Sequence, residues 1–265
     1  MRREPASARD LFRSAGEADR FAASLGTALV GGRVLYFEAV GSTNDVLKGL
    51  ACEDAPAGLV AVAEEQTAGR GREGRAWHSP PGAGLYFSYV LRPRLEVALA
   101  AWLTGTAALG AAAAIREFTG VEALIEWPND VVVDGRKLGG VLAESRTSGG
   151  AVDFAAVGVG LNVDLDAGEL PGDLRAAVTS LAQETGEAVD RRALFAAVLA
   201  GIDSRVALLA EGRTAELADE FNALCRSVGL PLERPGAEAG TAEGVDELCR
   251  MIVRTSDGRK AVVTT

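Results

Sequence analysis

The stretch VVVDGRKLGGVLAES, from Val131 to Ser145, predicts a β-hairpin. Asp134 and Gly135 form its turn, because an Asp-Gly pair favours the primed turn types that join two antiparallel strands closely. Lys137 then stands on the returning strand, and a pair of glycines follows it. The glycines leave room for a ligand or another segment to lie across the sheet. Lys137 has a simpler interpretation, because a lone lysine on a strand is usually a solvated charge at the sheet edge.

More strands and helices are expected on both sides of this hairpin. Apolar runs, several with alternating side chains, predict strands at 33–40, 58–66, 84–93, 123–127 and 151–165. Apolar residues at helical spacing predict helices at 10–25, 96–118, 191–211 and 214–225, and Gly120 ends the second of them. In GSTNDVLKGLA, Ser42 is a candidate N-cap, and Asp45 follows at a spacing that resembles a capping box.

The last stretch, 228–265, changes character and is interpreted as a small separate β-domain. Its segment MIVRTSDGRKAVVT predicts a second hairpin with Asp257 and Gly258 at the turn, after a loop rich in Gly, Pro and Glu. So short a domain must lean on the larger one. We therefore expect a large domain at 1–227, including an N-terminal helical segment at 1–32, and the β-domain at 228–265.

The composition is that of a soluble globular protein, with 265 residues of which 48% are hydrophobic and 24% are charged. A formal charge of −10 disfavours nucleic-acid binding, which would need a local basic patch against the global field. Three irregularly spaced cysteines and a single histidine disfavour a zinc site or a disulfide framework, and fit a reducing compartment. The alanine-rich segment 95–115 is expected to be a buried helix, and no signal sequence is evident, so we expect a cytoplasmic protein.

The segment EQTAGRGREGRAW, from Glu65 to Trp77, combines flexibility with positive charge. Glycines at 69, 71 and 74 let the backbone approach a ligand, and arginines at 70, 72 and 75 offer forked donors for phosphate or carboxylate. The segment lacks the P-loop pattern, and RAWHSPPG forbids the helix that a dinucleotide fold needs next. The residues alone leave two interpretations: a loop that binds an anionic ligand, or a solvated flexible loop.

Two shorter polar motifs are equally open. EWPND, from Glu126 to Asp130, puts Asn129 and Asp130 where a strand ends at a rigid proline, so these residues organise a turn or bind a ligand. STN, from Ser42 to Asn44, stands at a helix start, where it caps the helix or orients a small polar ligand.

Together, the order and spacing of these motifs resemble the biotin protein ligase family. That family has STN, QTAGRGR-x-GR-x-W, WPND, KL-x-G and a late G-x-G-x-N in this succession. Here the motifs stand at 42–44, 66–77, 127–130, 137–140 and 158–162. The resemblance is highly specific from Tyr36 to Asn162 and looser towards the C-terminus.

The resemblance implies an α+β fold: a mixed β-sheet with helices packed on it, similar to class II aminoacyl-tRNA synthetases, and a small C-terminal SH3-like β-barrel. It implies an enzyme that adenylates biotin with ATP and Mg²⁺, releases pyrophosphate, and transfers biotin to a lysine of a biotin carboxyl carrier protein domain. Such enzymes occur as monomers and homodimers. Many bacterial members also have an N-terminal DNA-binding domain, for which the segment before residue 33 leaves no room, so we expect a ligase without repressor function and no nucleic-acid partner.

By similarity, Arg72 and Lys137 are the catalytic residues: Arg72 holds the biotin carboxylate and then the acyl-adenylate, and Lys137 bridges the carboxylate and the α-phosphate. The biotin-binding residues implied are Ser42, Thr43, Asn44, Gln66, Gly69, Arg70, Gly71, Arg72 and Lys137. The residues implied for ATP and the adenylate are Arg72, Arg75, Trp77, Asn129, Asp130, Lys137 and Asn162. No motif identifies metal ligands.

One residue departs from the family pattern, because Glu126 stands before WPND where a lysine is common. A positive charge near the nucleotide thereby becomes negative. Two rival functions stay open. A lipoate ligase or octanoyl transferase shares the architecture, but a transferase needs a cysteine nucleophile, and none of the cysteines has a base beside it in a motif. A protein that senses biotin without turnover is the other rival, which Glu126 leaves open.

Overall fold

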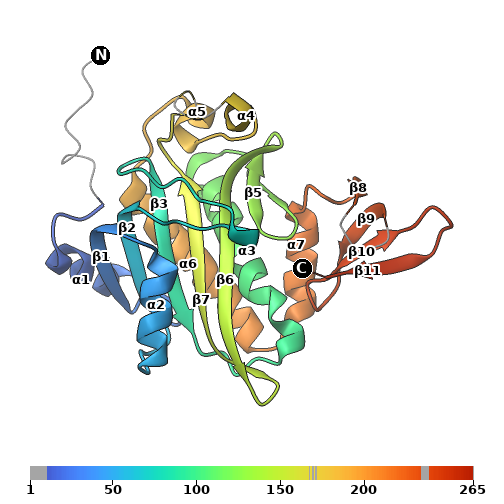
Figure 1. The fold of residues 1–265 in the computed structure, drawn as a ribbon, viewed down its shortest axis with the longest axis horizontal. Coiled ribbons are helices and arrows are strands. Elements are labelled where there is room, and N and C mark those ends of the chain that lie inside the picture. Colours follow the sequence, from blue (N-terminus) through green and yellow to red (C-terminus); the bar gives the residue numbers. More distant parts are fainter. Residues whose placement is uncertain (1–10, 167, 169, 171, 234–238, 265) are drawn as a thin grey trace.

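The structure, a computed structural model, describes residues 11–166, 168, 170, 172–233 and 239–264. Its centre is a seven-stranded sheet with the strand order β1-β2-β3-β7-β6-β5-β4 (Figure 1). In chain order the strands are β1 Arg33–Val40, β2 Leu59–Gln66, β3 Gly84–Leu91, β4 Leu124–Glu126, β5 Asp130–Val133, β6 Arg136–Ser148 and β7 Ala151–Asn162. β1 and β2 are parallel and all other neighbours are antiparallel, so the mixed sheet expected from the sequence is confirmed.

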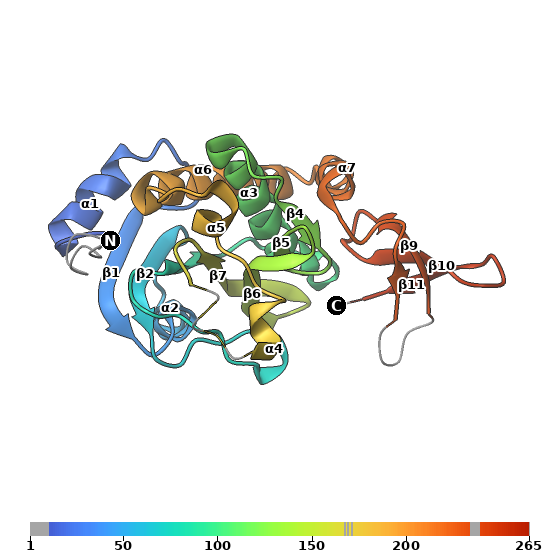
Figure 2. The ribbon, with the colours of Figure 1, turned by 90° about the horizontal axis from the view of Figure 1, so that it is seen from above.

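Helices cover both faces of this sheet (Figure 2). On one side lie α3, α6 and α7, while α2 packs on the other face over β2, β3 and β7. The helix bounds are α1 Ala15–Ser24, α2 Thr43–Cys52, α3 Ala101–Thr119, α4 Gly172–Arg175, α5 Leu181–Thr185, α6 Arg191–Ala210 and α7 Thr214–Leu224. A 3-10 helix, η3 (Val97–Leu99), leads into α3.

Strand β3 shows how the sheet separates two layers of core. Its residues Leu85, Phe87 and Tyr89 belong to the large apolar cluster that includes α3 and α6. Val90 belongs instead to a smaller cluster with Leu47 of α2. Because side chains alternate between the two faces of a strand, neighbouring residues of β3 serve different layers. All positions of β3 are buried, so this strand lies at the centre of the fold.

Helices α3 and α6 are long and apolar enough to cross a membrane, judged by length and composition alone. Both pack against each other inside the fold, and 67% of the apolar window at 97–119 is buried. The buried helix expected at 95–115 is therefore confirmed, with a 3-10 turn at its start and Gly120 as its C-cap.

The first helix begins later than its apolar spacing predicts. It starts at Ala15, because the Ser14 side chain accepts a hydrogen bond from the backbone N–H of Glu17 and caps the helix there. Leu11 and Phe12 precede the helix and are buried all the same. Their spacing therefore reports burial rather than helix, and the residue at the expected start, 10, lies outside the described residues.

Both predicted hairpins are confirmed. Asp134 and Gly135 join β5 to β6 with φ angles of 49° and 77°, in the left-handed region that primed turns require. Near the C-terminus, β10 (Met251–Arg254) and β11 (Lys260–Val263) pair antiparallel around the second Asp-Gly turn.

The C-terminal strands form a four-stranded antiparallel sheet of their own, ordered β11-β10-β9-β8, beside α7 (Figure 1). Its other strands are β8 (Pro231–Leu232) and β9 (Gly240–Val245). The indole N–H groups of Trp102 and Trp127 donate to backbone carbonyls of this part, at Glu247 (2.8 Å) and Cys249 (3.3 Å). Residues 234–238, in the loop expected to be rich in Gly, Pro and Glu, lie outside the described residues.

A buried ion pair connects the start of α6 to the sheet. Arg191 Nη2 lies 2.9 Å from Glu64 Oε2 on β2, and the two side chains are only 7% and 5% exposed. Arg191 Nη1 also donates to the Gly84 carbonyl at 3.0 Å, and the backbone N–H of Leu11 donates to the Glu64 carboxylate. The pair thus joins α6, β2, β3 and the segment before α1.

Glu64→Gln should destabilise the protein by about 3–5 kcal/mol, because the buried Arg191 charge loses this carboxylate. Chemical denaturation measures the change in the free energy of unfolding. Glu216→Gln is the matched control, since its ion pair with Arg213 on α7 is exposed, and it should leave the unfolding midpoint unchanged. Equal midpoints for both variants would contradict the role assigned to the buried pair.

Candidate functional site

A cavity of about 280 Å³ lies on the face of the sheet that α2 covers. The predicted site residues that line it are Ser42, Thr43, Asn44, Gln66, Arg70, Gly71, Arg72, Arg75, Trp77, Asn129, Asp130, Lys137 and Asn162. Gly69 is the predicted residue that does not line it. The fold therefore gathers the STN, loop, WPND, lysine and G-x-G-x-N motifs around one space.

Two glycines of β7 form part of the cavity floor. A Cβ atom at Gly158 would lie 2.5 Å from Asn44 Oδ1, and one at Gly160 would lie 2.6 Å from the Trp77 indole. Real Cβ contacts are never so short, so each glycine lets another segment rest directly on the strand. Asn44 comes from α2 and Trp77 from the end of the loop.

Lys137, Asp130 and Trp77 meet at one end of this floor. Lys137 Nζ lies 2.8 Å from Asp130 Oδ2 and 5.3 Å from the centre of the Trp77 ring. Gly140 of β6 makes room for them, because a Cβ there would lie 3.2 Å from Asp130 Oδ1. Asp130 Oδ1 and Trp77 Nε1 are buried and have no hydrogen-bond partner among the described residues. A ligand here would meet one free acceptor and one free donor.

The glycine and arginine loop is a short hairpin rather than an open coil. Arg70 and Ala76 form an antiparallel bridge. At the tip lies the 3-10 helix η2 (Arg72–Gly74), in which Glu73 and Gly74 have φ angles of 57° and 72°. A glycine at 74 suits this left-handed turn.

The other two glycines of the loop differ in what they do. A Cβ at Gly69 would lie 2.7 Å from the Trp77 carbonyl oxygen, so the base of the loop depends on close backbone approach. Gly71 has φ −103°, and a Cβ there would meet nothing closer than 3.7 Å. Gly71 therefore does not have a backbone conformation that requires glycine, and it lies in the cavity wall.

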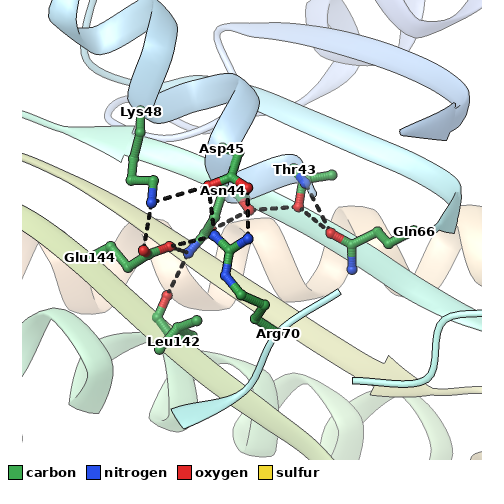
Figure 3. A network of polar contacts seen from close by, with 9 residues as sticks. Thr43, Asn44, Asp45, Lys48, Gln66, Arg70, Leu142 and Glu144 are labelled. Carbon is green, nitrogen blue, oxygen red and sulfur yellow. Dashed lines mark hydrogen bonds and ion pairs between the residues drawn. The ribbon is translucent and has the colours of Figure 1, made fainter. Parts of the chain in front are cut away.

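A chain of hydrogen bonds joins the STN residues to the sheet (Figure 3). Asn44 Nδ2 donates to Glu144 Oε2 at 2.9 Å, and Asn44 Oδ1 accepts from Ser88 Oγ at 2.6 Å. The backbone N–H of Thr43 donates to Gln66 Oε1 at 2.9 Å, and Thr43 Oγ1 lies 2.7 Å from Ser88 Oγ. Ser88 and Glu144 were not predicted as site residues, because each stands inside a strand without a recognisable motif.

The capping-box expectation at the start of α2 is wrong. Ser42 occupies the N-cap position, but its side chain makes no capping hydrogen bond. Asp45 turns instead to the loop, where Arg70 Nη1 and Nη2 donate to its two oxygens at 2.7 and 2.6 Å. The hydrogen bond from Arg70 lowers the pKa of Asp45 from 3.8 to about 2, so this carboxyl is ionised at neutral pH.

Arg72 differs from the other cations of the cavity wall. Arg70 and Lys137 have carboxylate partners inside 3 Å, and Arg75 has the exposed Glu73 carboxylate at 3.5 Å. The Arg72 side chain makes no hydrogen bond or ion pair within the part of the chain that the structure describes. Its forked donors are therefore available to an anion.

The two asparagines of the motifs hold the backbone around the cavity. Asn129 Nδ2 donates to the Val141 carbonyl at 2.9 Å, and the Val141 N–H donates back to the Asn129 carbonyl at 2.9 Å. Asn162 Nδ2 donates to the Thr179 carbonyl at 3.0 Å. The turn-organising interpretation of EWPND is therefore correct for Asn129, and contact of either amide with a nucleotide stays a prediction.

Glu126 does not line the cavity. Its carboxylate lies 2.9 Å from Arg226 Nη1, in the segment after α7, and its side chain is 46% exposed. The negative charge that replaces the family's lysine is thus paired outside the cavity.

An apolar wall after β7 was missed by the sequence analysis. Leu165, Leu170, Leu174 and Val178 line the cavity. Val178 lies next to β6, in a bridge with Lys137, so the wall stands beside the lysine. The leucines at intervals of four and five were the available signal, but the helices there are too short for a periodic pattern.

No group of three or more His, Cys, Asp or Glu side chains able to hold a metal ion occurs among the described residues. Asp130 is the one carboxylate among the described residues that line the cavity. A cation there would need most of its oxygen ligands from a bound phosphate or water.

Comparison with known proteins gives concordant results. Residues 36–162 match the model of the biotin/lipoate A/B protein ligase family. The chain is 32% identical to the bifunctional ligase/repressor BirA of Bacillus subtilis, over 90% of this chain and 74% of that protein. It is 37% identical to a biotin–acetyl-CoA-carboxylase ligase of Paracoccus denitrificans, over 76% of this chain and 86% of that protein. A solved structure of an Aquifex aeolicus biotin protein ligase in complex with biotin and ATP matches with a TM-score of 0.76 at 29% identity, covering 88% of this chain and 95% of that one.

Gly160→Ala should push the Trp77 indole off the floor of the cavity, because the new Cβ would lie 2.6 Å from it. Quenching of tryptophan fluorescence by acrylamide should then increase, since Trp102 and Trp127 remain buried. Gly49→Ala on α2, where a Cβ meets nothing within 4 Å, is the control and should leave quenching unchanged. Unchanged quenching in Gly160→Ala would refute the seating of Trp77 on this glycine.

Proposed function

Because this chain belongs to the biotin/lipoate A/B protein ligase family, we propose that it is an ATP-dependent biotin protein ligase. It adenylates biotin and passes the biotinyl group to a lysine of a biotin carboxyl carrier protein domain. The observation that carries this proposal is one cavity lined by the Arg72 guanidinium, which has no partner among the described residues, the Lys137 amine and the polar STN side chains. The Aquifex aeolicus ligase of the same fold was solved with biotin and ATP bound.

In the first step, a carboxylate oxygen of biotin attacks the α-phosphorus of ATP, and pyrophosphate leaves. Both reactants are anions, so fixed positive charge at the reacting atoms lowers the barrier. Arg72 offers two parallel donors to the carboxylate and then to the acyl-adenylate. Lys137 offers a compact charge between the carboxylate and the α-phosphate, and Asp130 holds its amine at 2.8 Å.

We assign the ureido ring of biotin to the polar floor under α2. The ring has two N–H donors and one carbonyl acceptor, and a site that matches such groups discriminates strongly against analogues without them. Ser42, Thr43, Asn44 and Gln66 present hydroxyl and amide groups to this part of the cavity. Gly71 and Arg72 are assigned to the valerate end, and Gly69 shapes the base of the loop.

We assign the nucleotide to the end of the cavity around Lys137. Trp77 of the loop and Asp130 lie beside Lys137 there, and Arg75, Asn129 and Asn162 line the same cavity. The Trp77 N–H and Asp130 Oδ1, which have no partner among the described residues, are polar atoms there that a nucleotide or its metal would satisfy.

In the second step, the carrier lysine attacks the carbonyl carbon of the mixed anhydride, and AMP leaves. No nucleophile from this chain is required. Cys52, Cys225 and Cys249 lie outside the cavity lining, and burial raises the pKa of Cys249 to about 12, against a thiolate. This arrangement disfavours the octanoyl transferase alternative.

Mg²⁺ is expected to enter with ATP. This ion commonly binds through one or two carboxylates, water and substrate phosphates. Asp130 fits as the carboxylate, because its Oδ1 is buried in the cavity lining without a partner among the described residues. When bound, the ion neutralises phosphate charge, while Arg72 and Lys137 act on the carboxylate and the α-phosphate.

Several finer features belong to the same proposal. We propose a class II synthetase-like arrangement of the large sheet and an SH3-like C-terminal domain from residue 228, supported by the separate four-stranded sheet. We propose a cytoplasmic enzyme, monomeric or homodimeric. We propose no operator binding either, because the formal charge of −10 disfavours DNA, and a salt-sensitive gel shift on operator DNA would contradict this.

The proposed function is tested by incubating the purified protein with biotin and ATP. Pyrophosphate should be released, and a carrier domain should gain biotin on one lysine. Lipoate should not support release. Tight biotin binding without pyrophosphate would favour the sensor alternative, and release with lipoate alone would favour the lipoate ligase.

Lys137→Ala should slow adenylation by about 10²- to 10³-fold, the usual cost of losing one preorganised donor at a developing charge. Single-turnover pyrophosphate release at saturating biotin and ATP measures it. Lys260→Ala on β11, in the separate C-terminal sheet, is the control and should behave as wild type. Unchanged release in Lys137→Ala would remove this residue from the reaction.

Arg72→Gly should let the biotinyl-adenylate leak into solution, because the cavity loses the guanidinium assigned to hold it. Leakage should appear as biotin on many lysines of a bystander protein, detected by mass spectrometry. Retention as tight as in wild type would contradict the assignment of Arg72 to the adenylate.

A further inference from the structure

Arg70 lies between two carboxylates that come from different elements. Its two terminal nitrogens donate to Asp45 of α2 at 2.7 and 2.6 Å, and Nη2 lies 3.6 Å from Glu144 of β6. Lys48 completes the group, with its amine 2.6 Å from Glu144 and 3.1 Å from Asp45 (Figure 3). Two cations and two anions therefore form a neutral cluster at the edge of the cavity.

This geometry differs from that of an arginine whose donors are available to an anionic ligand. The Arg70 fork is already engaged by Asp45 in the bidentate arrangement that a ligand carboxylate would otherwise use. Arg72, two positions on, has its fork free among the described residues. The two arginines of the same loop therefore have different roles.

The Arg70 side chain also fastens the loop. Within residues 69–76, all of which the structure describes, it alone makes side-chain hydrogen bonds to residues outside the loop. The tip otherwise makes bonds within itself, such as Gly71 N to Arg75 O at 2.7 Å and the exposed Arg75–Glu73 pair at 3.5 Å. Movement of the tip away from the cavity is therefore opposed chiefly by Arg70 on one arm and by Trp77 on the other.

The cluster is connected to the cavity floor as well. Glu144 Oε2 accepts from Asn44 Nδ2 at 2.9 Å, and Glu144 Oε1 accepts from Lys48 at 2.6 Å. Asn44 lines the cavity next to Gly158. A ligand that contacts Asn44 on the floor therefore lies one hydrogen bond away from the carboxylate beside Arg70.

We propose that the Arg70 side chain positions the loop rather than binding biotin, and that its ion pair with Asp45 is a latch that holds the loop and Arg72 over the activated biotin. This inference rests on the proposed function. The latch determines how long the adenylate is retained, whereas the charges that accelerate its formation belong to Arg72 and Lys137.

A double-mutant cycle with Asp45→Asn, Arg70→Gln and the double variant tests the latch. Asp45→Asn and Arg70→Gln should each release preformed biotinyl-adenylate about two- to fivefold faster and raise the KM for biotin. In Asp45→Asn, whose side chain does not line the cavity, kcat for pyrophosphate release should stay unchanged. The double variant should release the adenylate as fast as either single variant, because both substitutions remove the same Arg70–Asp45 pair. Arg70→Lys should recover only part of the retention, since it keeps the charge and loses the fork.

Asp153→Asn is the matched control. It removes the carboxylate from another Arg–Asp pair, in which Arg146 Nε of β6 donates to Asp153 Oδ2 of β7 at 2.8 Å, outside the cavity lining. It should retain the adenylate as wild type does. Thermal melting should be equal for all the variants, so that a general loss of stability is excluded as the cause.

Limited trypsin digestion gives a readout that needs no catalysis. Asp45→Asn should be cut after Arg72 faster than wild type, because the loop is no longer fastened to α2. Equal cutting of Asp45→Asn and the wild type would overturn the latch. It would also be overturned if Arg70→Gln speeds adenylate release far more than Asp45→Asn does and the two effects add in the double variant. If the wild-type protein releases no pyrophosphate, the proposed function is refuted instead. The digestion still tests the latch in that case, because it does not depend on catalysis.

Discussion

The rest of this site depends on three glycines that lie close together on one face of the sheet. Gly140 of β6 and Gly158 and Gly160 of β7 lie on the face that α2 covers, on two hydrogen-bonded strands. A few residues away the same face is ordinary core, where Val90 packs with Leu47. At the glycines, the missing Cβ atoms let the side chains of three other segments rest directly on the strands; these side chains are Asn44, Trp77 and Asp130. Close approach of side chain to backbone is what converts a packed sheet into a binding floor.

The second organising feature is how positive charge is placed in a protein whose formal charge is −10. Charges separated by more than about 8 Å are largely screened at physiological ionic strength, so the surface excess of carboxylates acts weakly in the cavity. The electric field in the cavity therefore depends on whether each nearby cation is paired with a carboxylate. Arg70 is bound to Asp45, Lys137 is held by Asp130, and Arg72 is free among the described residues. Arg70 therefore fastens the loop, Lys137 is fixed at the end of the cavity proposed for the reaction, and Arg72 can bind a ligand as it moves.

The sequence predicted the strands, the long helices and both Asp-Gly hairpins, because each depends on local spacing or on a turn that only a few residues allow. It failed where a residue's partner is distant in the chain. Asp45 has the spacing of a helix cap, yet its partner is Arg70 in the loop. Glu126 seemed to place negative charge near a nucleotide, yet Arg226 pairs with it outside the cavity. Leu11 fits the apolar spacing of a helix, yet it is buried outside α1, in the segment that precedes the helix.

By itself, the sequence determined most of the polar residues that line the cavity, because the motifs are short, ordered and individually constrained by turn chemistry and by the family resemblance. Thirteen of the predicted residues line the cavity, and their identities needed no coordinates. Only the tertiary structure decided what each of them does to the others. The pairing of Arg70 with Asp45, the freedom of Arg72 and the apolar wall at Leu165, Leu170 and Leu174 follow from which strands and helices become neighbours. Ion pairs and contacts of this kind act over a few ångströms, and distance in space is not contained in a motif.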